Sequence, residues 1–200
     1  MNTNRFNFSS NESTRSGLAN LKGTLLVSTE RLRGSRFEKA VVLLMQHDEK
    51  GTFGVTLNKP ANAKVRKAWS ELTGETVPDE QAIVAGGPLH GPVFALHQDP
   101  TMYDVEMTGG LYVSAQVDKL QQLTSQFENP YRIVIGIAGW KPGQLSTEVN
   151  DGYWYQLPMD IDLIFDDPEW MWDFCLQECG RRQVADIIGN DNIPFDPSLN

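Results

Sequence analysis

The 200-residue sequence is poor in cysteine and histidine and has no long hydrophobic run. Its longest apolar runs, such as residues 41–45, are far shorter than the roughly 20 residues that a membrane-spanning helix needs. The mean hydropathy is −0.36. Residues 1–17 lack the apolar segment and the cleavage site of a secretory signal peptide. We therefore expect a cytoplasmic protein with no membrane partner.

The few cysteines and histidines exclude the common metal and redox signatures. Cys175 and Cys179 lie four residues apart in a segment with helical spacing, where disulfide geometry is poor. His47, His90 and His97 are distant from them, and no H-E-x-x-H motif is present. The serine-hydrolase elbow G-x-S-x-G and the phosphate-binding loop that ends in Gly-Lys-Ser or Gly-Lys-Thr are also absent. We expect free thiols, no bound metal and no cofactor.

Basic side chains are scarce in the second half of the chain. Residues 1–100 hold 12 basic and 10 acidic side chains, whereas residues 101–200 hold 5 and 16, and the formal net charge is −9. Proteins that bind nucleic acids without other help present clustered lysine and arginine to the phosphates. Direct nucleic-acid binding is therefore not expected.

Hydrophobic spacing predicts intermixed strands and short helices. The apolar runs at 24–28, 40–46 and 53–58 predict strands, and the polar turn before the last predicts an antiparallel hairpin. Residues 63–72 have helical spacing that stops near Gly74, and 131–138 is a further strand. This order indicates an α+β fold: one domain, residues 21–189, with a mixed, largely antiparallel sheet and several short packing helices. Residues 1–20 are expected to be a flexible polar arm and 190–200 a flexible acidic tail.

Three local predictions concern the second half. Ser114 stands where the N-cap of a helix with inward residues from Val117 to Phe127 belongs. Residues 161–165 are predicted to be extended, so the acidic residues around them suggest a solvated strand edge and a helix start. Asp167 is predicted to cap a helix that begins at Pro168 and continues to about Arg182.

Two glycine-bearing corners are candidates for function. The strand over 82–85 runs into Gly86, Gly87 and Pro88, where a missing Cβ permits close backbone approach. The strand over 131–138 runs into Gly139 and Trp140, and a helix over 144–149 follows. Each corner could face a ligand, and the start of the helix could bind an anion. The alternative is a purely structural corner with Trp140 as part of the core.

Several short motifs follow one another at fixed spacing: residues 37–44 leading to His47, 51–60, 86–88, 93–97 and 139–145 ending at Glu148. In their order and spacing they resemble the AlgH/YqgE family of bacterial proteins. The sequence departs from the family pattern at Lys39-Ala40, Lys59 and Lys141. The resemblance covers residues 21–182. It implies an α+β fold, a cytoplasmic location and no established enzymatic reaction, although some members are called transcriptional regulators.

Three functions remain open at this point. The favoured one is a non-enzymatic regulatory protein that binds an unknown protein or small molecule. Its candidate binding residues are His47, Asn58, Gly86, Gly87, Pro88, His97, Gly139, Trp140, Gln144 and Glu148. The alternative is a hydrolase or transferase built around His47, Asn58, His97 and Glu148 near the two glycine corners. Direct DNA binding is implied only by the regulator label of some family members.

Overall fold

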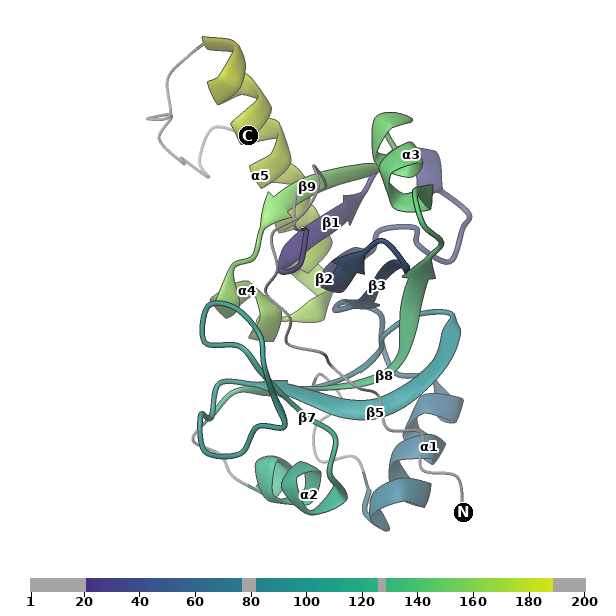
Figure 1. Ribbon diagram of the computed structural model, residues 1–200, viewed down its shortest axis with the longest axis vertical. Helices are drawn as coiled ribbons and strands as arrows, with labels where there is room; N and C mark the ends of the chain where they lie inside the picture. Colours follow the sequence, from purple (N-terminus) through teal and green to yellow (C-terminus); the bar gives the residue numbers. More distant parts are fainter. Residues whose placement is uncertain (1–20, 77–81, 126–128, 189–200) are drawn as a thin grey trace.

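Strand β8 (Tyr131–Trp140) is central to the fold, because the two halves of a nine-stranded sheet are joined through it (Figure 1). The computed structural model describes residues 21–76, 82–125 and 129–188. The other strands are β1 (Thr24–Ser28), β2 (Val41–Asp48), β3 (Gly51–Thr56), β4 (Ile83–Ala85), β5 (Leu89–His97), β6 (Val105–Glu106), β7 (Tyr112–Ser114) and β9 (Trp154–Pro158). The helices are α1 (Ala63–Thr73), α2 (Val117–Ser125), α3 (Gln144–Asn150), α4 (Ile161–Phe165) and α5 (Pro168–Ile188), with a 3-10 turn at Glu30–Leu32.

The sheet is mixed and largely antiparallel, as the sequence predicts. Its strand order is β6-β7-β5-β8-β3-β2-β1-β9, and β4 pairs with β8 outside this path. The β4–β8 pair is parallel and the other pairs are antiparallel. Together with the helices this confirms an α+β domain. The predicted arm and tail lie outside the described residues.

The predicted hairpin is confirmed as β2 and β3, with a register shift between Leu44 and Gln46. Side chains alternate between the two faces of the neighbouring strand β1. Leu25 and Val27 belong to the apolar cluster that includes α4 and α5, whereas Leu26 belongs to a second cluster on the opposite face with Trp140. The sheet is therefore buried on both faces in this half.

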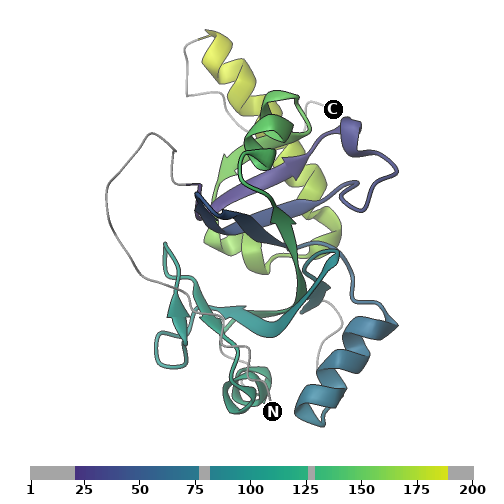
Figure 2. The ribbon, with the colours of Figure 1, turned by 45° about the vertical axis from the view of Figure 1, so that its right-hand side comes forward.

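Helices α1 and α2 lie beside the β5 half of the sheet (Figures 1 and 2). Helix α1 begins where the Asn62 side chain accepts hydrogen bonds from two backbone N–H groups, and it ends at Gly74 in the left-handed conformation. Its Trp69 is fully buried in a third apolar cluster, together with Leu120 of α2. The helical prediction for 63–72 is thus confirmed and extends one residue further.

Helices α4 and α5 cover the other half of the sheet, where α5 contacts β1, β2 and β9 (Figure 1). The prediction that residues 161–165 are extended is wrong. They form α4, and the Asp160 carboxylate caps it by accepting the Asp162 N–H at 3.1 Å. The predicted Asp167 cap of α5 is confirmed by a hydrogen bond from the Glu169 N–H, but the helix continues to Ile188.

Candidate functional site

The chain crosses over β8 at Gly86, Gly87 and Pro88. Strand β4 pairs with one edge of β8, and β5 pairs with the other edge in the opposite direction. The connection lies backbone against backbone on β8. A Cβ on Gly86 would stand 2.3 Å from the Gly136 oxygen, and one on Gly87 would stand 2.2 Å from the Ile137 carbonyl carbon. Both glycines, and Gly136 with its φ of +91°, are therefore required by this crossing.

The second glycine corner lies next to the first along β8. Gly139 is exposed, and a Cβ on it would stand 3.0 Å from Cδ1 of Leu89, the first residue after the crossing. Leu89 is 50% exposed. The structure therefore brings the two predicted corners together, and an apolar side chain is exposed where they meet.

The Glu148 carboxylate of α3 organises the polar groups that follow Gly139. Its Oε2 accepts hydrogen bonds from the indole N–H groups of Trp140 and Trp154, both at 2.8 Å. Its Oε1 accepts the side-chain N–H of Gln144, also at 2.8 Å. The Gln144 Oε1 in turn accepts the Lys141 N–H at 3.1 Å. Three predicted site residues thus form one network.

This network is attached to a buried aromatic cluster. Trp140 and Trp154 are 6% and 2% exposed, and their ring centroids lie 6.0 Å apart in an edge-on arrangement. Phe37 lies against both rings, at 6.1 and 5.5 Å. Trp140 is therefore part of the core. Helix α3, whose start was the candidate anion site, has only seven residues. The backbone N–H of Lys141, beside its first turn, already donates to the Gln144 side chain.

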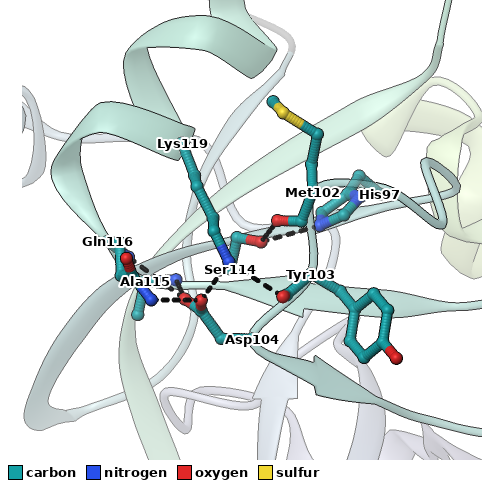
Figure 3. A network of polar contacts seen from close by, with 8 residues as sticks. All are labelled: His97, Met102, Tyr103, Asp104, Ser114, Ala115, Gln116 and Lys119. Carbon is teal, nitrogen blue, oxygen red and sulfur yellow. Dashed lines mark hydrogen bonds and ion pairs between the residues drawn. The ribbon is translucent and has the colours of Figure 1, made fainter.

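His97 belongs to a buried chain of hydrogen bonds at the other end of β8 (Figure 3). The Asp99 N–H donates to Nδ1 at 3.2 Å, so Nε2 carries the proton and donates to Ser114 Oγ at 2.9 Å. Ser114 Oγ donates to the Met102 carbonyl at 2.5 Å. Burial lowers the pKa of His97, against the opposing effect of Asp99 and Asp104. The structure thus holds His97 as a neutral donor.

Ser114 is not the cap of α2, contrary to the prediction, because it ends β7 and is fully buried. The Asp104 carboxylate lies beside the start of the helix instead: it accepts the N–H groups of Ala115 and Gln116, the two residues before α2, at 2.7 and 3.2 Å (Figure 3). Lys119 pairs with it at 2.5 Å. Burial tends to raise the pKa of Asp104, but these hydrogen bonds outweigh it and lower the pKa. Sequence spacing missed Asp104 because it lies eleven residues before Ala115.

His47 and Asn58 have separate local partners. His47 Nδ1 lies 2.6 Å from Thr52 Oγ1 across the hairpin. Asn58 spans a corner: its Oδ1 accepts the Val41 N–H at 2.9 Å, and its Nδ2 donates to the Lys39 carbonyl at 2.8 Å. Lys39 has a φ of +49°, which Asn58 thereby holds in place.

The predicted residues therefore do not form one site. His47 is close to the Trp140 end of β8, because Thr52 pairs with both residues. His97 pairs with Tyr131, the first residue of β8, and Trp140, which holds Glu148, is the last. Nine residue steps separate these ends, a path of about 30 Å along the strand at roughly 3.3 Å each. His97 and Glu148 therefore cannot transfer a proton to each other, since that needs a reach of about 3 Å.

Comparison with known proteins identifies the family. A family model described as AlgH-like matches residues 25–183. The chain belongs to the AlgH-like family. A protein of Streptomyces coelicolor named only as a UPF0301 protein is 33% identical over 198 residues, covering 92% of this chain and 97% of the relative. A UPF0301 protein of Stenotrophomonas maltophilia is 32% identical over 165 residues, covering 78% and 87%.

Two solved structures are similar to this AlgH-like chain. The solution structure of the AlgH protein from Pseudomonas aeruginosa matches with a TM-score of 0.64 and 24% identity, covering 91% of this chain and 100% of that one. The crystal structure of a Corynebacterium diphtheriae protein matches with a TM-score of 0.63 and 24% identity, covering 83% and 90%. At this identity the likeness shows the shared fold.

The AlgH-like domain holds both cysteines as buried free thiols on α5. Burial raises the pKa of Cys175 to about 12 and that of Cys179 to about 11. Within residues 21–76, 82–125 and 129–188, three or more His, Cys, Asp or Glu side chains never gather as a metal site would require. Helices in these ranges include none long and apolar enough to span a membrane.

Proposed function

We propose that this AlgH-like chain is a non-enzymatic regulatory protein that acts by binding a protein partner. The observation that carries the proposal is the use of the candidate polar groups inside the fold. Glu148 accepts three hydrogen bonds, Asn58 makes two, and His97 makes two while fully buried. Groups engaged in this way hold the domain in shape, which leaves its exposed surface for binding.

The surface proposed for this partner is the meeting point of the two glycine corners. Leu89 is half-exposed there, beside the exposed Gly139. The core of a protein interface is apolar and depleted in charged residues, as the surroundings of Leu89 and Gly139 would allow. The crossing of Gly86 and Gly87 over β8 holds this surface rigid, so that little conformational entropy is lost on binding.

We further propose that the protein works in the cytoplasm and that any effect on transcription is indirect. Two free buried thiols are typical of a reducing compartment. The net charge of −9 opposes direct contact with the phosphates of DNA. A hydrolase or transferase is the weaker alternative, because His97 lies at the opposite end of β8 from Glu148, and His47, which lies near the Glu148 end, is hydrogen-bonded to Thr52.

Site-specific photocrosslinking in the native host tests the proposal. A benzophenone amino acid would replace Leu89, and in the matched control it would replace Leu72, which is 41% exposed on α1. We expect a discrete adduct with one protein at position 89 and none at position 72. Equal labelling at both positions, or no adduct at position 89 across growth phases, would overturn the proposal.

A further inference from the structure

A surface hollow of about 400 Å³ lies between α4, the first turns of α5 and the start of β8. Leu163, Phe165 and Phe174 give it apolar walls, and three aspartates stand around them. The remaining lining residues are Gln98 and Pro130. Pro130 directly precedes β8, so this hollow lies at the opposite end of the strand from Gly139. It is therefore separate from the surface around Leu89.

The hollow carries negative charge that its own segment does not balance. Asp160, Asp162 and Asp166 are all exposed, and residues 155–180 contain no lysine or arginine. The nearby Arg132 is only 2% exposed. Its guanidinium donates to the carbonyl oxygens of Ile164, at 2.7 Å, and of Asp166. That charge holds the C-terminal end of α4 from below, which leaves the aspartates facing solvent.

An apolar strip on α5 continues from the hollow. Phe174, which lines it, is 47% exposed, and Trp170 is 69% exposed. Residues four apart on a helix lie on the same face, so the two rings are neighbours. Glu169 and Asp173, also four apart and exposed, run beside them. Large exposed aromatics beside unbalanced carboxylates form a surface with two distinct binding chemistries.

We propose that this surface, the α4–α5 face, binds a basic amphipathic segment of a partner protein. Lysine or arginine side chains of the segment meet Asp160, Asp162 and Asp166, and its apolar side chains cover Phe174 and Trp170. Cations also bind favourably over aromatic rings of this kind. A small cation would contact only the hollow, whereas the strip extends about 6 Å further along α5, at 1.5 Å per residue. The length of the surface therefore favours a polypeptide.

The proposal goes beyond the function proposed above, because it uses a different surface and names the chemistry of the partner. It is tested with the full chain and a fluorescent 16-residue helical peptide that has leucines on one face and lysines on the other. Fluorescence anisotropy measures binding at low and physiological salt. Two further peptides serve as probes: one with glutamate in place of each lysine, and one with serine in place of each leucine.

The decisive variants remove each chemistry separately. The triple variant D160N/D162N/D166N removes three charges, while the amide that replaces the Asp160 carboxylate retains an oxygen that can cap α4. The double variant W170Q/F174Q removes the strip. The control for charge is E106Q/D118N/D151N, at exposed positions elsewhere, and the control for apolar surface is L72Q. Circular dichroism checks that each variant is folded.

We expect the lysine–leucine peptide to bind the unchanged chain and to bind each decisive variant about tenfold more weakly, since several exposed ion pairs or two aromatic contacts contribute on that scale. Both controls should stay within twofold. Equal loss in the charge control, or equal binding of the glutamate peptide, would overturn the proposal. Equal binding of the lysine–serine peptide or of spermine would assign the surface to a simple polycation. Self-association that W170Q/F174Q abolishes would assign the surface to a second copy of the chain. Either result also overturns the proposal.

Discussion

Replacing Glu148 with alanine should destabilise the protein through the two tryptophans that it holds. The carboxylate accepts the indole N–H groups of Trp140 and Trp154, whose side chains lie in the core. Without an acceptor each buried donor is left unpaired, at about 1–3 kcal/mol each. We expect a loss of about 3 kcal/mol in the free energy of unfolding. For a chain of this length, that lowers Tm by about 6–12 °C.

Chemical denaturation followed by tryptophan fluorescence measures this loss. Glu148→Gln should cost about 1 kcal/mol, because an amide oxygen can still accept both indole N–H groups. Glu71→Ala is the matched control, since Glu71 forms only an exposed ion pair with Lys67 on α1. In a W140F/W154F background, Glu148→Ala should cost less than about 1 kcal/mol, because both donors are gone. A loss of about 3 kcal/mol in that background would show that Glu148 does not act through the two indoles.

Three further predictions concern stability. Hydrogen bonds from Arg181 and Arg182 lower the pKa of Glu178 from 4.5 to about 2. The stability that Glu178 contributes to the folded protein is therefore complete above pH 4.5 and is lost as the pH falls toward 2. An E178Q variant should show a shallower loss of stability in acid titrations followed by circular dichroism. Asn58→Ala should cost about 1–3 kcal/mol in urea denaturation, because the Val41 N–H loses its acceptor. Asn58→Asp should cost a comparable amount, because it keeps that acceptor but sets a carboxylate oxygen against the Lys39 carbonyl in place of the amide donor. Gly87→Ala should cost about 3 kcal/mol or more, or prevent folding, whereas Gly180→Ala, in an open part of α5, should raise Tm slightly.

Local patterns predicted the elements whose signals are contained in their own residues. The β2–β3 hairpin follows from two apolar runs around a polar turn, and α1 follows from helical spacing that stops at Gly74. Helix α4 was missed because five residues, with apolar positions at 161, 163, 164 and 165, also fit a short strand. Its Asp160 cap was present in the sequence, but so short a helix depends on packing and on Arg132 beneath it.

The non-local contacts could not be predicted from spacing. Asp104 binds the two residues before α2 from another part of the chain, and spacing alone left Ser114 as the apparent cap. The glycines of the crossing could be recognised in the sequence. Their contact with β8 could not be predicted, because Gly86 lies against Gly136, fifty residues later. The grouping of the candidate site residues was likewise predictable only in part. Trp140, Gln144 and Glu148 are close together in the sequence, around the start of one helix. The position of His97 depends instead on the register between β5 and β8.

A nitrogen-15 NMR titration, with His97 and the Trp140 and Trp154 indoles as reporters, measures whether the candidate polar side chains are engaged inside the fold, so that binding is left to the surface. This engagement predicts that the His97 ring carries its proton on Nε2, that its pKa lies below the ordinary value of 6.5, and that both indole protons exchange slowly with water. A His97 ring protonated on Nδ1 or titrating at 6.5 or above, together with fast-exchanging indole protons, would contradict it.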